Sequence, residues 1–329
     1  MEHERKSIVK RKIASLNRIL IRKGVKFLEK RPRADRIRLN KVLAWILPIR
    51  AIIENAQVRR LNKSSSEPLF ELERSKGFCK FKNDERFTNM LVAFAQSAKE
   101  RHLRGSKSKN NSKDYLRQIW NLSEIDKDSF FILEWAVQAN VLKSVSHYFE
   151  GKYPLLHEIS VFYSPETEVD KLEKWQGSQL FHMDGGGTQC VKIWMLCQDV
   201  EPEHGPTVVV SAEQSSRLAK SISYKPGTKL ENDAILTNLE KLQTFALTGE
   251  KGSWFATDTD RSFHYGSRTT EQSSRLVVMF HYVDNNSSYY MPVLSNHYTK
   301  QLKSIPNFSR ELLKKSKIAE SSLRYRLSD

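Results

Sequence analysis

The stretch SQLFHMDGGGTQCVKIWMLC, from Ser178 to Cys197, decides the fold of this chain. Ser178 to Leu180, with the apolar Phe181 after them, predict a strand, and because side chains alternate along a strand, His182 and Asp184 fall on one face. The glycines at 185 to 187 end this strand in a loop. Gln189 to Cys197 then alternates polar and apolar residues, which predicts a second strand. This pattern predicts a β-rich core that carries polar side chains close to the end of a strand.

Three later segments continue the β pattern between turn signals: Thr207 to Ser211, Ser253 to Thr257 and Arg275 to Val283. His264 lies between the last two segments, and a hairpin joining them would place His264 beside Arg275. The sequence therefore predicts that a histidine and an arginine distant from His182 come close to one another in the folded chain.

Three of these polar residues form a known ligand set. Two imidazoles and one carboxylate, from His182, Asp184 and His264, are the ligands of a facial-triad Fe(II) site, which leaves coordination positions open for other molecules. An arginine can hold an acidic co-substrate through two parallel hydrogen bonds, and Arg275 has the right position in the sequence for this role. We expect a non-haem iron site served by a carboxylate-binding arginine.

In the order and spacing of these segments, residues 159 to 283 resemble the phytanoyl-CoA dioxygenase family of Fe(II)- and 2-oxoglutarate-dependent oxygenases. The resemblance is carried by FHMD, by KIWMLCQDVEPEHGPTVVV and by EKGSWFATDTDRSFHYGSR followed by SSRLVVMFHY. It implies that His182, Asp184 and His264 bind iron, that Arg275 binds the distal carboxylate of 2-oxoglutarate, and that Trp194 lies beside this co-substrate. The reaction it implies is a dioxygenase reaction in which Fe(II), 2-oxoglutarate and O2 hydroxylate a small-molecule or lipid-like substrate.

The chain departs from the family pattern close to these residues. Many relatives carry Pro-Gly-Ser-His where this chain has Ser211 to Gln214, and the usual His-Gly-Ser becomes His264-Tyr265-Gly266-Ser267, which displaces the serine by one position. None of these departures removes a metal ligand, but the surroundings of the ligands and the shape of the substrate pocket stay open.

The patterns and the resemblance together predict an α+β protein whose double-stranded β-helix (jelly-roll) core is buttressed by helices. Apolar residues at helical spacing predict helices over Phe87 to Leu103 and Ser129 to Phe149. We expect four segments along the chain: a basic helical extension over 1–63, a helical region that supports the core over 64–158, the oxygenase core over 159–299, and a C-terminal helix and tail over 300–329.

Positive charge is concentrated in residues 1–63, which carry a net charge of +14 against +2 for the remainder. Three interpretations stay open for this segment: a helical extension packed on the body, association with an anionic membrane surface, and binding of nucleic acid or another polyanion. The charge also keeps two alternatives to the small-molecule enzyme open. One is a nucleic-acid-directed oxygenase, and the other is a non-catalytic jelly-roll binding protein.

The composition bears on where the protein works. Three cysteines argue against a disulfide framework and for a reducing compartment. The longest apolar run in the basic segment, Val42 to Ile49, is too short to span a bilayer, and no cleavable signal peptide is apparent. The sequence therefore predicts a cytoplasmic protein without a transmembrane segment, with peripheral membrane attachment as the alternative.

Overall fold

The computed structural model describes residues 58, 59, 61–105, 113–168, 175–185, 189–231 and 242–284 of the 329-residue chain. Most of the predicted basic extension and all of the predicted segment 300–329 lie outside the described residues. Gly186 and Gly187 of the glycine run also lie outside them.

The strands of the described residues form two antiparallel sheets. The larger sheet has the strand order β1-β7-β4-β9-β3-β2, and the smaller sheet has the order β6-β5-β8. The larger sheet contains β1 (Phe78–Phe81), β2 (Arg117–Asn121), β3 (Leu155–Ser164), β4 (Cys190–Leu196), β7 (Trp254–Thr257) and β9 (Arg275–Val283). The smaller sheet contains β5 (Val208–Val210), β6 (Thr244–Ala246) and β8 (His264–Tyr265).

An apolar layer joins the two sheets. Leu196, Phe255 and Val277 of the larger sheet pack in one cluster with Val209 of the smaller sheet. Because side chains alternate along each strand, the residues between them on β4, β7 and β9 point to the opposite face. One face of the larger sheet therefore turns toward the smaller sheet, and its other face is left for the helices.

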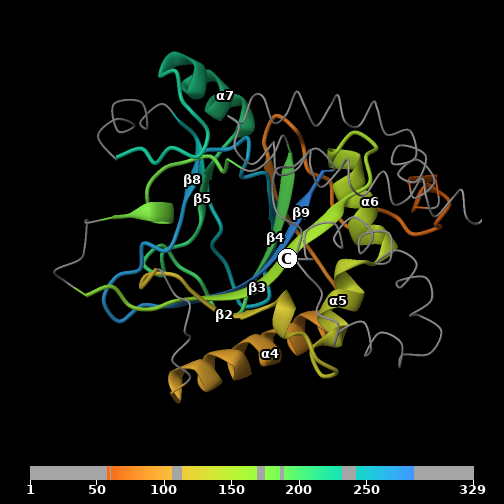
Figure 1. The fold of residues 1–329 in the computed structure, drawn as a ribbon, viewed down its shortest axis with the longest axis horizontal. Helices are drawn as coiled ribbons and strands as arrows, with labels where there is room; N and C mark the ends of the chain where they lie inside the picture. The colour runs from red at the N-terminus through yellow and green to blue at the C-terminus, as the bar shows by residue number, and fades with distance from the viewer. Residues whose placement is uncertain are drawn as a thin grey trace, which may run out of the picture.

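Three helices cover that other face: α4 (Glu85–Leu103), α5 (Phe130–Ala136) and α6 (Ala139–Tyr148). In Figure 1 they lie along the lower and right side of β3 and β9, while α7 (Ala212–Ser221) lies at the far end, above β5 and β8. The side chain of Asp84 caps α4 by accepting a hydrogen bond from the backbone N–H of Phe87. Within the described ranges, no helix combines the length and the apolar character that crossing a bilayer requires.

The helix predicted over Ser129 to Phe149 is two helices. Gln138 has extended backbone angles (φ −62°, ψ 148°) and separates α5 from α6. Ile132 of α5 and Val141 of α6 are both fully buried in the same core cluster. Apolar spacing could not mark this break, because both helices direct their apolar residues into one core.

Phe280 of β9 ties the larger sheet to the helical layer. It is fully buried, and its ring centroid lies 4.6 Å from that of Trp135 in α5 and 6.2 Å from that of Trp254 in β7. The three rings form the centre of the main core cluster. Packing between sheet and helices therefore depends on this aromatic group.

We expect Phe280→Ala to lower the free energy of unfolding by about 3–5 kcal/mol, since it leaves a cavity in a closely packed layer. Urea denaturation followed by circular dichroism measures this change. Met90→Ala is the matched control, because Met90 lies on the exposed side of α4 with 44% exposure, and its effect should stay within about 0.5 kcal/mol. A loss below about 1 kcal/mol for Phe280→Ala would contradict the role of this side chain in the layer.

The strand predicted before the His-x-Asp pair is wrong. Gly177–Gln179 form a 3-10 turn, and Gly177 has a φ of +56°. A Cβ at Gly177 would lie 2.2 Å from the hydroxyl of Tyr115, so this turn requires glycine. After the turn, Phe181 and His182 form only isolated β-bridges, with Leu230 and His264.

The other strand predictions are confirmed. The predicted strand at 275 to 283 has the same bounds as β9, and β4, β5 and β7 match their predictions to within one residue at each end. The predicted hairpin between the last two segments is wrong, because β4 lies between β7 and β9 in the larger sheet. His264 belongs to β8 in the smaller sheet, so the connection from Gly266 to Ser274 crosses from one sheet to the other.

Candidate metal centre

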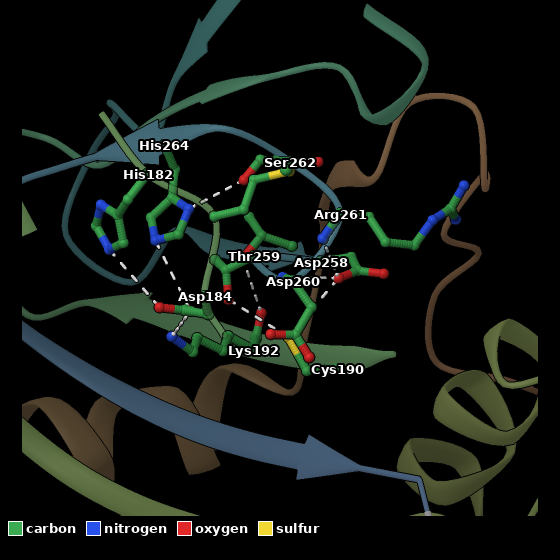
Figure 2. A network of polar contacts seen from close by, with 12 residues as sticks. His182, Asp184, Cys190, Lys192, Asp258, Thr259, Asp260, Arg261, Ser262 and His264 are labelled. Atoms are coloured by element: carbon green, nitrogen blue, oxygen red, sulfur yellow. Dashed lines mark hydrogen bonds and ion pairs between the residues drawn. The ribbon is translucent and has the colours of Figure 1, made fainter. Parts of the chain in front are cut away.

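The structure brings the three predicted ligands together. One ligand atom from each of His182, Asp184 and His264 lies within 4.8 Å of the other two. Asp184 Oδ1 is 3.6 Å from His182 Nε2, and Asp184 Oδ2 is 3.8 Å from His264 Nε2. Figure 2 shows both imidazoles directed toward the carboxylate of Asp184. Both histidines are buried, and the group faces the interior between the two sheets.

Backbone pairing places the two histidines. The N–H of His182 donates to the carbonyl of His264 at 3.0 Å, and the N–H of His264 donates back at 2.9 Å. Residues that face each other in such a pair direct their side chains to the same side, and the two ring centroids are 4.2 Å apart. The N–H of Asp184 donates to the carbonyl of Thr259 at 2.8 Å. These bonds fix the two segments that carry the ligands without a regular strand at the His-x-Asp pair.

Hydrogen bonds to backbone carbonyls set the tautomer of both imidazoles. Nδ1 of His182 lies 2.8 Å from the carbonyl oxygen of Leu180, and Nδ1 of His264 lies 3.0 Å from that of Ser262. Because a carbonyl only accepts, each Nδ1 carries the hydrogen and each Nε2 presents its lone pair toward Asp184. Burial lowers the pKa of His182 to about 2 and that of His264 to about 4. Both rings are therefore neutral near pH 7 and available as ligands.

Lys192 of β4 forms an ion pair with the third ligand. Its Nζ lies 2.6 Å from Oδ2 of Asp184, and both side chains are largely buried. Burial alone would raise the pKa of Asp184, but the ammonium of Lys192, which also donates a hydrogen bond to the carboxylate, holds this pKa well below its usual value. The same attraction raises the pKa of Lys192 against the effect of its own burial. Asp184 is consequently ionised.

Lys192 was not among the predicted site residues. The available signal was a lysine within an otherwise apolar strand, on the same face as Trp194. A charged side chain in a buried strand needs a partner of opposite charge, and Asp184, eight residues before Lys192, is a carboxylate close to it in the sequence.

We expect Lys192→Met to destabilise the metal-free protein by about 3–5 kcal/mol, because it leaves the charge of Asp184 buried without its partner. A divalent metal ion should restore much of this loss, since it supplies a positive charge to the same carboxylate. Urea denaturation with a chelator and then with anaerobic Fe(II) measures both effects. Lys220→Met on the exposed end of α7 is the control. Equal stability of Lys192→Met and the wild type would show that the ion pair contributes nothing.

Arg275, at the start of β9, carries a buried guanidinium that has no carboxylate partner in the part of the chain that the structure describes. It is 4% exposed, and Nη1 and Nη2 donate to Thr207 Oγ1 at 3.3 Å and Ser267 Oγ at 2.9 Å. Its Nε has no hydrogen-bond partner among the described residues, and no carboxylate in these ranges lies within ion-pair distance. Burial lowers its pKa to about 10, which still leaves it charged near pH 7. A buried cation of this kind is suited to an acidic ligand.

The displaced serine reaches this arginine. Ser267 has a φ of +62°, and its hydroxyl accepts the bond from Arg275. Ser164 Oγ donates to Ser267 Oγ at 3.0 Å, and Gln179 Nε2 donates to the backbone carbonyl of Ser267 at 2.8 Å. The departure from the family pattern therefore does not separate the serine from the guanidinium.

Along the strand direction of β4 and β9, Trp194 lies between the position of Lys192 and that of Arg275. In the β4–β9 register Lys192 faces His281 and Trp194 faces Met279, so Trp194 is one step along the inner face from Lys192 toward Arg275. Its indole N–H donates to Thr257 Oγ1 at 2.9 Å. Trp194 is half-buried, so part of its surface stays available to a neighbouring molecule.

Comparisons with known proteins give only a distant likeness. No family model matches the chain, and no curated protein matches it. Among solved structures, EctD from S. alaskensis with bound Fe is 13% identical, with a TM-score of 0.46, and the match covers 70% of this chain and 82% of that one. The non-heme alpha ketoglutarate dependent carbocyclase SnoK from nogalamycin biosynthesis is 14% identical, with a TM-score of 0.44 and coverage of 73% and 92%. The non-heme alpha ketoglutarate dependent epimerase SnoN from the same biosynthesis is 15% identical, with a TM-score of 0.43 and coverage of 70% and 84%. Likeness at this distance supports no functional conclusion, and membership of the phytanoyl-CoA dioxygenase family stays a prediction.

Proposed function

We propose that this protein is an Fe(II)- and 2-oxoglutarate-dependent dioxygenase, and that its two sheets form the double-stranded β-helix (jelly-roll) core of such an enzyme. One combined observation supports this best. An ionised Asp184 faces the lone pairs of two neutral imidazoles, in the same interior as a buried Arg275 that has no carboxylate partner among the described residues. A metal site alone or a buried arginine alone would suit many proteins, but the two together suit a metal and an acidic co-substrate.

The donor set fits the proposed metal. Neutral His182 and His264 with ionised Asp184 would hold Fe(II) through two nitrogens and one oxygen, and three protein ligands leave positions open for a 2-oxo acid and O2. When bound with these molecules, Fe(II) supplies the oxidation of an unactivated C–H bond. Lys192 would keep the second oxygen of Asp184 hydrogen-bonded and so limit how the carboxylate turns.

The remaining residues would orient the co-substrate. Arg275 would pair bidentately with the distal carboxylate of 2-oxoglutarate, while Thr207 and Ser267 hold the guanidinium in place. Trp194, between the levels of Lys192 and Arg275, would flank the co-substrate along its length. The apolar layer around Leu196 and Val277 would exclude water from this end of the interior.

An anaerobic titration tests this proposal. Addition of Fe(II) and then 2-oxoglutarate to the purified full-length protein should produce the weak visible charge-transfer band of the chelate. Exposure to O2 should then yield succinate, slowly, even without a primary substrate. A folded protein that develops no band at saturating Fe(II) and 2-oxoglutarate would leave the non-catalytic binding protein as the better interpretation.

The primary substrate and the basic segment belong to the same proposal. We propose a cytoplasmic enzyme with a small-molecule or lipid-like substrate, and an anionic membrane surface or another polyanion as the partner of the basic segment. Leu61 is buried in the main core cluster, so the end of this segment packs on the body. A truncation should therefore remove only residues 1–57. Salt-dependent retention on anionic liposomes or on nucleic acid should disappear with this truncation, and retention on nucleic acid alone would favour the nucleic-acid-directed oxygenase.

A further inference from the structure

A β-bulge directs a second group of metal-binding side chains into one place. The pairing of β3 with β9 shifts between Leu156, which faces Tyr282, and Glu158, which faces His281. His157 is the additional residue at this shift. A bulge interrupts the strict alternation of side chains and re-aims the extra one. His157 and Glu158, although adjacent in the sequence, can therefore both approach His281 across the pair of strands.

The ligand atoms of this group lie as close together as the distance limit met by the predicted iron ligands. One ligand atom from each of His157, Glu158 and His281 lies within 4.8 Å of the other two. The two imidazole centroids are 4.9 Å apart and the rings are nearly perpendicular, at 88°. His281 is 2% exposed, while His157 and Glu158 are half-buried. The group is therefore partly enclosed, and it stays reachable from solvent through His157 and Glu158.

Neighbouring residues hold the carboxylate in place. Glu158 Oε1 accepts hydrogen bonds from Gln118 Nε2 at 2.7 Å and from Ser160 Oγ at 2.5 Å. Carboxylates and imidazoles that bind metals are commonly oriented by such bonds.

The nearest charges permit a cation. His281 faces Lys192 in the β4–β9 register, and the ammonium of Lys192 is matched by Asp184 at 2.6 Å. Glu158 adds one negative charge to the group, and the two histidines add none when neutral. Imidazole nitrogen with carboxylate oxygen suits zinc and similar divalent transition metals, whereas Mg2+ and Ca2+ prefer oxygen ligands.

We propose that His157, Glu158 and His281 form a second metal site, of the zinc-binding class, on the bulge between β3 and β9. Two imidazoles and one carboxylate are a known zinc ligand set that leaves the fourth position to water or another ligand. The proposal does not use His182, Asp184 or His264 as ligands, so its test can be separated from that of the oxygenase proposal.

Zinc stoichiometry in the full-length protein tests this site. His182→Ala removes a ligand of the first group, and in that background we expect one tightly bound equivalent of Zn(II) by isothermal titration and by metal analysis after gel filtration. Adding His157→Ala should remove this equivalent, and adding Glu158→Gln should weaken it strongly while preserving the shape of the side chain. His147→Ala, which removes an exposed histidine of α6, is the matched control and should leave the stoichiometry unchanged.

The outcomes separate the two metal groups. Circular dichroism should show that each variant keeps the wild-type fold, which is expected because His157 and Glu158 are only half-buried. His157→Ala alone should keep the charge-transfer band of Fe(II) with 2-oxoglutarate. If the His182→Ala protein binds no Zn(II), or if its His157→Ala derivative binds as much as before, the second site does not exist.

Discussion

Replacing His182 with alanine is expected to weaken Fe(II) binding by more than about 100-fold, the upper range for losing a residue that merely supports a ligand. In the proposed site, Nε2 of His182 is one of three donors, and it lies 3.6 Å from Oδ1 of Asp184, which is another. Its loss leaves His264 and Asp184, which alone cannot form a facial set of three ligands. Anaerobic titration of Fe(II), with and without 2-oxoglutarate, measures the change.

Two further variants separate loss of a ligand from loss of structure. His204→Ala removes a half-buried histidine whose Nδ1 accepts a bond from the N–H of Glu201 in a turn, and its Fe(II) affinity should equal that of the wild type. Asp184→Asn keeps the volume of the side chain but removes its charge, so it should lose Fe(II) as His182→Ala does. Tight Fe(II) binding by a folded His182→Ala protein would contradict the assignment of the ligands.

The spacing of apolar residues predicted most strands of the core. These strands are either buried on both faces or alternate between buried and less buried side chains, and both kinds of burial leave a regular pattern in the sequence. Residues 275 to 283 are buried on both faces of the sheet, and their run of apolar residues gave the bounds of β9 correctly. The alternation in Gln189 to Cys197 gave β4 to within one residue at each end. In both strands most residues that are apolar in the sequence are buried in the fold, so the sequence pattern alone was sufficient to predict the bounds of the strand.

The backbone conformation of the segment before His182 is determined by local hydrogen bonds and by a glycine, and the spacing of apolar residues does not reveal either. Gln176 and Gln179 form a reciprocal capping box around the 3-10 turn, and the left-handed Gly177 lies against Tyr115. The prediction that His182 and Asp184 approach a common point agrees with the geometry, although the strand on which it relied is wrong. Their approach depends on backbone pairing with His264 and Thr259, residues about eighty positions away.

The order of strands within a sheet is also invisible to periodicity. His264 and Arg275 were expected to meet across a hairpin, but β4 separates β7 from β9, and His264 lies in the other sheet. For the same reason, the Lys192 ion pair and the bulge at His157 were not predicted, because each depends on which segment of the chain becomes the neighbour in the fold. Single-sequence patterns identify which faces are buried, whereas the partner of each face is set by the whole chain.

Replacing Arg275 with alanine should lower the affinity for 2-oxoglutarate by at least about 30-fold, which corresponds to the lower end of the ~2–5 kcal/mol lost when one partner of a buried charge pair is removed. Fe(II) binding without 2-oxoglutarate should be unchanged, because Arg275 contacts Thr207 and Ser267 and none of the three ligands. Titration of the charge-transfer band with 2-oxoglutarate measures the affinity, and high concentrations should restore part of the signal. Arg217→Ala on the exposed side of α7 is the control.

Two companion measurements make the assignment of Arg275 sharper. Arg275→Lys keeps the charge but loses the planar pair of donors, so its affinity for 2-oxoglutarate should fall between those of the wild type and Arg275→Ala. The stability of the Arg275→Ala protein without 2-oxoglutarate is the reference for the next measurement, because the substitution removes a buried cation and also its bonds to Thr207 and Ser267. Stabilisation by added 2-oxoglutarate, measured as a shift in the Tm, should disappear in the same variant. An unchanged affinity for 2-oxoglutarate would place the co-substrate's distal carboxylate elsewhere and leave the buried guanidinium to a different anion.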